Sequence, residues 1–327
     1  MTKVAINGFG RIGRPTFKRL IEHHPKVKVV AVNDLADRKT LTHLLKYDSI
    51  YGHYPQAEKT LSGVKFLAEK DPSRLPWKKM GVEVVLECTG AFRKYQDAVK
   101  HIQAGAKKVI ISAPSKDPQK IPSYVLGVNA DQLNLKKYSV LDMASCTTNC
   151  LAPVAKVLDQ TLGIVKGFMT TIHSYTTTQR ILDLSHKDLR RARAAAVNII
   201  PTSTGAAKAI GNVIPKLKGK LDGISIRIPT PAVSVLDLVC EVKKRTSPRA
   251  LNAAFVKASK KDLKGILTVE SLPLVSTDYI GNSHSAVIDA ENTLIRDNLV
   301  KILAWYDNEY GYACRLAEFA ELVGAHL

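Results

Sequence analysis

Short runs of β-branched residues alternate with amphipathic stretches over the first third of the chain. Four runs have the composition of strands, and residues 11–22 between the first two carry apolar side chains at helical spacing. The predicted strands are residues 3–7, 27–32, 82–87 and 108–111. Strands that alternate with helices are typical of a parallel sheet covered by helices, so we predict an α/β unit here.

The pattern changes after Cys150. One predicted helix, residues 151–162, is followed by five strand-like runs with few helices between them that could serve as crossovers. The runs are residues 168–173, 224–228, 234–242, 285–290 and 299–306. Antiparallel strands need no crossover, so we predict an α+β unit with a mixed, largely antiparallel sheet. The boundary falls near residues 144–150, and the amphipathic stretch 311–323 predicts a terminal helix.

Residues 175–201, called the excursion below, interrupt this second half. They have polar and basic clusters, such as three consecutive threonines at 176–178 and the basic run 190–193, but little strand pattern. Connections of this length without regular structure are usually functional. We therefore expect the excursion to contribute to function.

Length and composition indicate a folded protein of two units. A chain of 327 residues exceeds what one core usually accommodates, and 45% hydrophobic with 24% charged residues excludes disordered, collagen-like and disulfide-rich chains. No apolar run approaches the roughly 18 residues of a membrane span. The start, MTKVAINGF, lacks the apolar core of a signal peptide. We expect a cytoplasmic protein without a membrane partner.

The charge balance is strongly basic. Forty-eight Lys and Arg residues against 29 Asp and Glu residues give a net charge of +19, which attracts nucleotides, sugar phosphates, nucleic acid and anionic lipid alike. The basic residues are dispersed in pairs and triplets rather than in one block, which favours a solvated surface. A nucleic-acid or surface-binding role stays an alternative, and it predicts binding that weakens steeply with salt.

A glycine-rich string with Gly8, Gly10 and Gly13 directly follows the first predicted strand. Such glycines let the backbone approach a pyrophosphate, whose charge is stabilised by the unpaired N–H groups at the start of a helix. Asp34 ends the second strand about twenty residues later, where its carboxylate can accept hydrogen bonds from the adenosine ribose. Because Asp34 also repels a 2′-phosphate, the pattern predicts a Rossmann-type domain that prefers NAD over NADP.

Five cysteines are scattered along the chain without the spacing of a zinc site, so we expect neither a disulfide framework nor a metal. Cys88, Cys240 and Cys314 are interpreted as small buried apolar residues. Cys146 lies at the start of a predicted helix, which lowers the pKa of a thiol and favours the nucleophilic thiolate. Cys150 follows one helical turn later, which leaves a CxxxC redox pair open but supplies no full set of metal ligands.

His173 ends a predicted strand, and we pair it with Cys146 as the proton acceptor. Imidazole titrates near neutral pH and can therefore act as a base and then as an acid. A single histidine at the end of a strand is more often structural, so the pairing needs support from elsewhere in the chain.

Five strings resemble the glyceraldehyde-3-phosphate dehydrogenase family, nearly end to end and in the expected order. They are NGFGRIGR at 7–14, ASCTTNCLAP at 144–153, HKDLRRARAAAVNIIPTSTGAAKA at 186–209, RIPTP at 227–231 and WYDNEYGY at 305–312. The resemblance implies a homotetramer. It also implies an NAD-binding domain of residues 1–146, to which a C-terminal helix of residues 309–327 returns, and a catalytic domain of residues 147–308.

The resemblance implies a reaction in which glyceraldehyde 3-phosphate, NAD and inorganic phosphate yield 1,3-bisphosphoglycerate and NADH. Cys146 is implied to attack the aldehyde, and His173 to take the hydroxyl proton. Loss of hydride to the nicotinamide leaves a thioester on the cysteine, and phosphate then cleaves it.

The family motifs also assign binding residues. Thr176 and Arg227 are implied to hold the phosphate of the substrate. The pocket for the attacking phosphate is implied to comprise Ser145, Thr147, Arg191, Thr204 and Gly205. The residues implied to hold NAD are Gly8, Gly10, Arg11, Ile12, Gly13, Asp34, Lys70, Ser112 and Asn308.

The chain departs from the usual family residues at several places, although none of these departures removes a catalytic group. Met143 replaces an Asn, so we expect a hydrogen bond near the cysteine to be missing. Thr177 and Thr178 replace Asn-Asp, and Ala232 replaces an Asn. Ser185 replaces a proline and resembles relatives that accept NADP, which leaves NADP use open.

Two further alternatives use the same cysteine. Erythrose-4-phosphate dehydrogenase also relies on this cysteine and histidine, but its excursion departs from the pattern at residues 186–209. A peroxide-sensing thiol protein would use Cys146 as an accessible thiolate, and we interpret such oxidation as inhibition of the enzyme.

Overall fold

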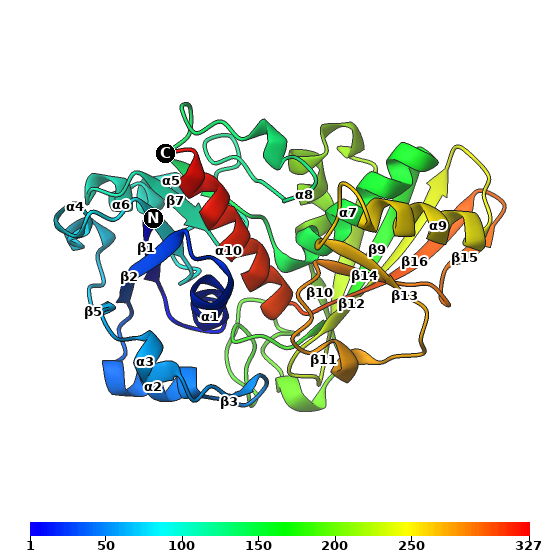
Figure 1. Cartoon of the computed structure of the whole chain (residues 1–327). Coiled ribbons are helices and arrows are strands. Elements are labelled where there is room, and N and C mark those ends of the chain that lie inside the picture. The colour runs from blue at the N-terminus through cyan, green and yellow to red at the C-terminus, as the bar shows by residue number, and fades with distance from the viewer. The chain divides into compact units, whose positions relative to one another are not determined.

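A computed structural model describes residues 1–327, which divide into two compact units (Figure 1). Unit 1 comprises Met1–Leu126, Ala130–Ser145 and Tyr312–Leu327, and unit 2 comprises Gly127–Asn129 and Cys146–Gly311. From Cys146 to Gly311 the chain stays in unit 2, and its C-terminal residues belong to unit 1. No helix in either unit combines the length and the apolar character that crossing a membrane requires.

Unit 1 contains a six-stranded parallel sheet with the strand order β5-β2-β1-β6-β7-β8. The strands are β1 (Thr2–Asn7), β2 (Val27–Asn33), β5 (Lys65–Leu67), β6 (Val84–Glu87), β7 (Lys108–Ile111) and β8 (Val140–Asp142). The four predicted strands and the parallel sheet are confirmed. Strands β5 and β8 were not predicted because three residues are too short to establish a period.

Helices cover both faces of this sheet. Alternate side chains of a strand point to opposite faces. Ala5 accordingly belongs to an apolar cluster with Trp77 and Val85, whereas the neighbouring Ile6 lies against Gly13 at the start of α1. The helices of unit 1 are α1 (Gly13–His23), α2 (Arg38–Lys46), α3 (Ala57–Thr60), α4 (Trp77–Met80), α5 (Tyr95–Ala98), α6 (Lys100–Gln103) and α10 (Tyr310–Ala325), and β3 (Tyr47–Asp48) pairs with β4 (Gly52–His53).

The predicted terminal helix is α10, which packs in unit 1 beside α1 (Figure 1). Glu321 accepts a hydrogen bond from His24 at 2.5 Å between Oε2 and Nδ1, and the ring of Phe319 packs against Tyr124. Near its end, Gly324 lies so close to Thr2 that a Cβ would come within 2.4 Å of the threonine Oγ1. These contacts fasten the C-terminal helix to β1 and to the end of α1.

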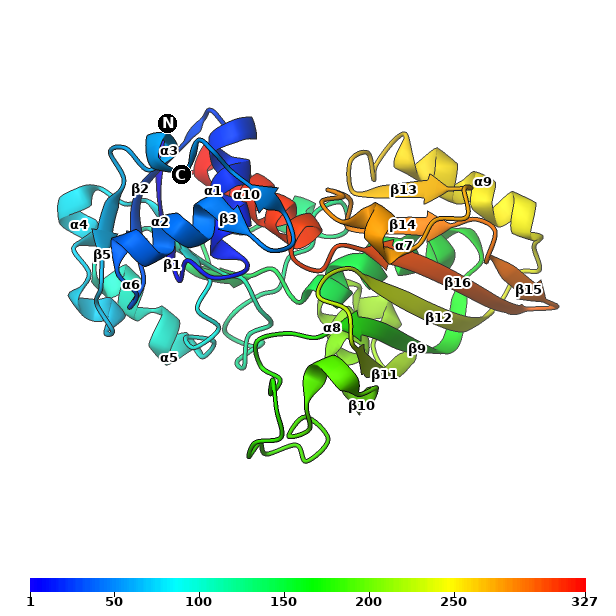
Figure 2. The same ribbon diagram turned by 90° about the horizontal axis from the view of Figure 1, so that it is seen from below.

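Unit 2 contains an eight-stranded mixed sheet with the order β10-β11-β9-β12-β16-β14-β13, and β15 pairs with β16 (Figure 2). The strands are β9 (Ile164–Ser174), β10 (Ile200–Ser203), β11 (Leu221–Ile228), β12 (Ser234–Val242), β13 (Leu267–Glu270), β14 (Ala286–Asp289), β15 (Leu294–Arg296) and β16 (Leu299–Tyr306). Only the β9–β11 and β13–β14 pairs are parallel. The prediction of a mixed, largely antiparallel sheet is confirmed.

Three helices, α7 (Cys146–Thr161), α8 (Ala206–Val213) and α9 (Pro248–Ser259), pack on this sheet. Alternate residues of β12 from Ser234 to Val242 are buried, and those between them are half-buried, as expected for a sheet with only one covered face. The sparsely covered face carries Phe168 and Ile224, which are 74% and 48% exposed.

The excursion has little regular structure, as predicted. A 3-10 turn at Ala195–Val197 is its only helix before β10 begins. Several of its apolar side chains, among them Ile181, Leu182 and Leu189, are more than three-quarters exposed.

Candidate active site

Cys146 is the first residue of α7, and His173 lies near the end of β9 in the same unit. The cysteine Sγ is 3.5 Å from Nε2 of His173, and the imidazole is almost fully buried. Folding of unit 2 therefore brings together the candidate nucleophile and the candidate proton acceptor, which are 27 positions apart in the sequence.

The other nitrogen of the imidazole, Nδ1, contacts two groups. It lies 2.7 Å from the carbonyl oxygen of Ser174 and 2.7 Å from a terminal nitrogen of Arg227, which also donates to that carbonyl at 3.0 Å. Arg227 stands opposite His173 in the register of β9 and β11. The two contacts require opposite tautomers, because Nδ1 donates to Ser174 only when it carries a proton and accepts from Arg227 only when it does not. The tautomer with the proton on Nδ1 is the one that leaves Nε2 free to accept a proton from Cys146.

The surroundings of this pair oppose charge on both partners. Burial raises the pKa of the Cys146 thiol, although Arg227 and the N–H groups at the start of α7 lower it. Burial, and then the nearby Arg227, lower the pKa of His173 to about 3. The expected net lowering of the thiol pKa is therefore wrong: the helix start acts in the predicted direction, but desolvation outweighs it.

Tyr306 is the last residue of β16, and its ring contacts that of His173. It was not among the site residues predicted from the sequence. Its hydroxyl hydrogen-bonds with Oγ1 of Thr147 at 2.9 Å and of Thr171 at 2.8 Å. Its ring meets that of His173 edge to face, at 6.1 Å between the centroids. The signals in the sequence were the place of Tyr306 in the string WYDNEYGY at 305–312 and its polar hydroxyl at the end of a mostly apolar strand.

Arg191 is held by the strand that precedes α8. Its Nε donates to Oγ1 of Thr202 at 2.9 Å, and a terminal nitrogen donates to the carbonyl of Ser203 at 3.2 Å. Its charge contributes to lowering the pKa values of both His173 and Arg227, so the two arginines and the histidine share one region.

Thr204 and Gly205 immediately precede α8. The Thr204 hydroxyl accepts a hydrogen bond from the N–H of Ala206 at 3.2 Å. Around Gly205, the position of a Cβ has no neighbouring atom within 4 Å. The start of this eight-residue helix is thus open to an approaching group.

Thr176 and Asn308 are less directly connected to the pair. The Thr176 hydroxyl lies 2.9 Å from the hydroxyl of Thr178, and no direct contact joins Thr176 to Arg227. Asn308 is buried and accepts a hydrogen bond from Ser234, whose oxygen in turn accepts from the N–H of Ser174.

The glycine-rich turn of unit 1 contains positions where a side chain would clash with neighbouring backbone, and one where the backbone is open to a ligand. Gly8 has a φ of +92°, and a Cβ there would come within 2.7 Å of the Thr89 nitrogen. At Gly13 a Cβ would lie 2.2 Å from the carbonyl oxygen of Gly8, so this glycine lets α1 pack against the turn. Gly10 has open space around it and is exposed, which suits a backbone that lies against a ligand.

Asp34 follows β2 and is oriented by two backbone groups. Its Oδ2 accepts from the N–H of Phe9 at 2.7 Å, and its Oδ1 accepts from the N–H of Ala36 at 3.0 Å. Each oxygen retains acceptor capacity for a ribose hydroxyl. The strand order reverses between β1 and β6, and in such sheets nucleotides bind at the carboxyl ends on either side of that point. The residues at this edge therefore fit a dinucleotide.

The remaining cofactor candidates differ in their surroundings. Arg11 pairs with Asp48 at 2.6 Å and precedes α1, with Ile12, rather than lying inside it. Lys70 is exposed, and Ser112 directly follows β7, where its N–H donates to the carbonyl of Glu87 at 2.9 Å.

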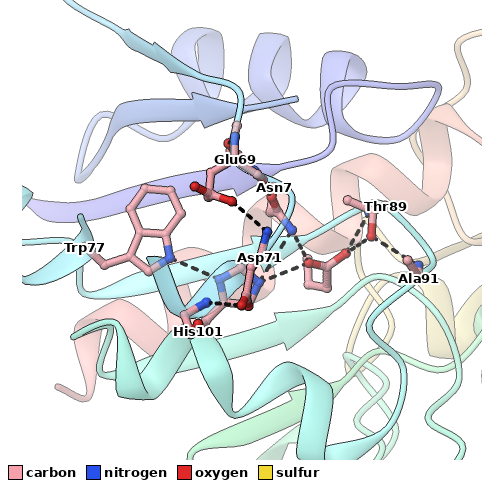
Figure 3. A network of polar contacts seen from close by, with 10 residues as sticks. Asn7, Glu69, Asp71, Trp77, Thr89, Ala91 and His101 are labelled. Atoms are coloured by element: carbon pink, nitrogen blue, oxygen red, sulfur yellow. Dashed lines mark hydrogen bonds and ion pairs between the residues drawn. The ribbon is translucent and has the colours of Figure 1, made fainter. Parts of the chain in front are cut away.

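A buried polar network supports this edge, and sequence reasoning missed it (Figure 3). Glu87 is fully buried and accepts from Asn7 Nδ2 at 2.5 Å, from His101 Nε2 at 3.1 Å and from the N–H of Thr89 at 2.8 Å. His101 accepts in turn from the indole N–H of Trp77 at 3.0 Å. The network joins the ends of β1 and β6 to the turn that contains Gly8.

Two family models match the chain. One, described as the C-terminal domain of glyceraldehyde 3-phosphate dehydrogenase, covers residues 145–308. The other, described as the NAD binding domain of the same enzyme, covers residues 2–95. The chain belongs to the glyceraldehyde-3-phosphate dehydrogenase family.

Named glyceraldehyde-3-phosphate dehydrogenases are similar along their whole length. The protein of Geobacillus stearothermophilus is 53% identical over 99% of this chain and 98% of its own. Glyceraldehyde-3-phosphate dehydrogenase 1 of Bacillus subtilis is 52% identical over 98% of both chains, and glyceraldehyde-3-phosphate dehydrogenase 2 of Streptomyces avermitilis is 51% identical over 99% of both.

Membership of the glyceraldehyde-3-phosphate dehydrogenase family confirms the resemblance drawn from the sequence motifs. The chain is an NAD-dependent oxidoreductase that acts on glyceraldehyde 3-phosphate, and NAD is its cofactor. The erythrose-4-phosphate dehydrogenase and polyanion-binding alternatives are not favoured by these matches.

None of the other cysteines of this family member forms a disulfide, and their surroundings differ. Cys150, Cys240 and Cys314 are buried, as interpreted for the last two, whereas Cys88 is half-buried. Burial raises the pKa of Cys88 and of Cys240 to about 12, so neither is an effective nucleophile. The structure contains no group of three or more His, Cys, Asp or Glu residues arranged to hold a metal ion.

Proposed function

We propose that Cys146 is the nucleophile and His173 the general base of a phosphorylating oxidation of glyceraldehyde 3-phosphate. The observation that carries the proposal is the 3.5 Å separation of Sγ and Nε2 at the start of α7. Both groups are neutral at rest, because burial raises the thiol pKa and lowers that of the imidazole. Sγ therefore transfers its proton to Nε2 as it attacks the aldehyde carbon.

The protonated imidazole then donates to the oxygen that becomes the hydroxyl of the hemithioacetal. His173 takes the proton back from that hydroxyl as the carbonyl of the thioester forms. Bound NAD would supply the acceptor for the hydride of the same carbon. The Ser174 carbonyl holds the Nδ1–H, so that Nε2 is the nitrogen that exchanges the proton.

We infer two phosphate sites in unit 2. Arg227 supports the site for the substrate's own phosphate, because its Nε is buried without a hydrogen-bond partner. Thr176 is proposed to bind the same phosphate. A phosphate oxygen at Arg227 would satisfy the buried Nε through a charge-assisted hydrogen bond.

Inorganic phosphate is the proposed second substrate, which cleaves the thioester to give 1,3-bisphosphoglycerate. The support comes from the charge of Arg191 and from the open start of α8 beside it, where N–H groups favour an anion. The residues proposed for this site are Ser145, Thr147, Arg191, Thr204 and Gly205. The Thr147 hydroxyl already bonds Tyr306, so its backbone N–H is the better candidate donor.

We assign catalysis to unit 2 and most of NAD binding to unit 1. The residues proposed to hold NAD are Gly8, Gly10, Arg11, Ile12, Gly13, Asp34, Lys70 and Ser112 of unit 1, with Asn308 of unit 2. The Asp34 carboxylate supports NAD over NADP, since it would repel a 2′-phosphate. Ser185 is the one residue that supports some use of NADP.

The chain is proposed to act as a homotetramer in the cytoplasm. The exposed apolar residues of the excursion and of the open sheet face support self-association, because large exposed apolar patches mark interfaces. A reducing compartment is required to keep Cys146 a thiol.

Replacing the nucleophile tests the proposal. The variant Cys146→Ser is expected to form no NADH above background, because a hydroxyl at this position is a far weaker nucleophile than a thiolate. NAD affinity, measured by calorimetry, should stay near the wild-type value. NADH absorbance is followed with NAD or NADP and with or without inorganic phosphate. Turnover that persists in Cys146→Ser would contradict the assignment of the nucleophile. A steady-state rate that does not depend on the phosphate concentration would contradict the second phosphate site.

A further inference from the structure

Asp142 ends β8 with a carboxylate that is fully buried in unit 1. Its Oδ1 accepts from the N–H of Ala144 at 2.7 Å, and its Oδ2 accepts from the N–H of Ser115 at 3.0 Å. The Ser123 hydroxyl is a third hydrogen-bond partner. Burying a carboxylate is unfavourable unless donors of this kind compensate for the lost water.

One of these donors belongs to a residue in an unusual conformation. Ala144 has a φ of +53°, a left-handed conformation that residues other than glycine rarely adopt. Its carbonyl oxygen accepts from the hydroxyl of Tyr312 at 3.1 Å. Side-chain groups therefore hold both the N–H and the carbonyl of Ala144, two residues before Cys146, and such strain persists only where its surroundings impose it.

The second donor belongs to the loop after β7. Ser115 lies in residues 112–117, the loop that begins with the NAD candidate Ser112. The Ser115 hydroxyl anchors this loop further, since it accepts from the N–H of Asp117 at 2.9 Å and donates to the carbonyl of Arg93 at 3.4 Å. The Asp142 carboxylate thus connects the loop of residues 112–117 to Ala144, in the segment that leads to Cys146.

The same segment carries the departure at Met143. This side chain is buried and apolar, and its N–H donates to the carbonyl of Ile111 at 3.2 Å.

We propose that Asp142 is a positioning residue, which holds Ala144 and thereby sets the direction of the segment entering Cys146 relative to the loop after β7. The inference rests on the proposed role of Cys146 as the nucleophile. The carboxylate touches neither substrate nor cofactor and acts through the backbone of Ala144.

The charge state of Asp142 supports this role. Burial raises its pKa to about 6, against the N–H groups of Ala144 and Ser115, the Ser123 hydroxyl and the positive charge of Arg93, which lower it. A carboxylate kept at an unfavourable position is typical of functional sites.

The test is the rate at which iodoacetamide alkylates Cys146, followed by mass spectrometry. In Asp142→Asn, one amide nitrogen faces a backbone N–H, so Ala144 or Ser115 loses its acceptor. We expect alkylation and kcat to fall by about 10- to 100-fold, while KM for the aldehyde stays unchanged. Adding Ala144→Gly should restore most of both rates, because glycine adopts a positive φ without support.

Asp159→Asn is the matched control. Asp159 also accepts a backbone N–H, that of Ile164 at 3.1 Å, but it lies thirteen residues beyond Cys146 on α7. This variant should be less stable, with Cys146 alkylated at the wild-type rate. If Asp142→Asn behaves in the same way, Asp142 is merely structural and the proposal is overturned.

Tyr312→Phe keeps the test decisive if Asp142→Asn does not fold. It removes the second hydrogen bond to Ala144 and leaves the carboxylate in place, so alkylation should slow by about 2- to 5-fold. A wild-type rate in Tyr312→Phe would then overturn the proposal. Alkylation reports on the sulfur itself, so this result is independent of the Cys146→Ser turnover assay that tests the catalytic assignment.

Discussion

At the scale of single residues, the site combines an uncharged thiol with an uncharged imidazole. Burial keeps His173 neutral far below the pH at which a free histidine takes up a proton, and Arg227 acts in the same direction. A neutral base is what a thiol with a raised pKa requires, because the proton must leave Sγ as the carbon–sulfur bond forms. The cationic Arg227 lowers the pKa of both partners.

The lowered pKa of His173 predicts an acid-sensitive fold. The unfolded chain takes up a proton at this residue near the ordinary pKa of 6.5, whereas the folded chain does so only at about 3, so stability falls as the pH drops from 6.5 toward 3. Between pH 7 and pH 5 this residue alone should remove about 2 kcal/mol from the free energy of unfolding. Urea unfolding of the wild type and of His173→Asn at both pH values measures the difference.

His173→Asn should lose that share of the acid sensitivity, and its turnover should drop by about 10²- to 10⁴-fold for want of a base. The raised pKa of Asp142, about 6, makes the fold more stable as the pH falls, which is opposite to the effect of His173. Because both proteins contain Asp142, its contribution is the same in each and does not affect the difference between them. Equal pH dependence in the two proteins would contradict the neutral, buried state of His173.

At the scale of elements, the carboxyl ends of the parallel strands organise unit 1. Asn7 ends β1, Asn33 ends β2 and Glu87 ends β6, and each is a buried polar residue that follows buried apolar ones. Asn33 Nδ2 donates to Asn7 Oδ1 at 2.7 Å, which links the second strand to the network of Figure 3. The glycine-rich turn packs against this network. The Thr89 N–H donates a hydrogen bond to Glu87, and the same nitrogen occupies the space beside Gly8.

The network predicts a specific loss and a specific rescue. In Glu87→Gln an amide nitrogen would face the donors of Asn7 and His101, and leaving buried donors unsatisfied should lower stability by about 1–3 kcal/mol and weaken NAD binding. Adding Asn7→Asp should recover part of both losses, because the new carboxylate accepts from Gln at 87 and from Asn33. Thermal unfolding and calorimetry of NAD binding measure the two quantities. A double variant no better than Glu87→Gln would contradict this account.

At the scale of the whole molecule, exposed apolar surface is concentrated in unit 2. The excursion exposes Ile181, Leu189 and Ile199 at 86%, 82% and 70%, and Phe168 stands on the open face of the sheet. Residues of this kind are normally buried, so their exposure supports the proposal that this region is an interface between copies of the chain. The net charge of +19 would oppose close association at low salt, which makes the apolar contacts the necessary attractive contribution.

This surface predicts the assembly state. Light scattering coupled to gel filtration should give four chains for the wild type, and a smaller species for Leu189→Asp combined with Ile199→Asp, because burying two carboxylates in an apolar interface is strongly unfavourable. Leu272→Asp is the control, since Leu272 is 61% exposed outside this region. A double variant that remains four-chained would exclude this region from the interface.

Much of the architecture could be predicted because it is written in contiguous residues. The alternation of strands and helices, the glycine turn after β1 and the cysteine at the start of α7 each depend on neighbours within a few positions. The end of a predicted strand supplied His173 as a candidate, and the family motif RIPTP supplied Arg227. Short strands such as β8 escaped prediction, since three residues carry too little pattern.

The amino-acid sequence by itself determined the two-unit α/β and α+β organisation, the NAD fingerprint and the identity of the candidate nucleophile. Only the tertiary structure decided the charge states of Cys146 and His173, because desolvation depends on every segment that packs around them. It also revealed Tyr306, Glu87 and Asp142, which act through contacts between segments remote in the chain. A linear pattern records which groups are present, whereas their distances and their separation from water arise only on folding.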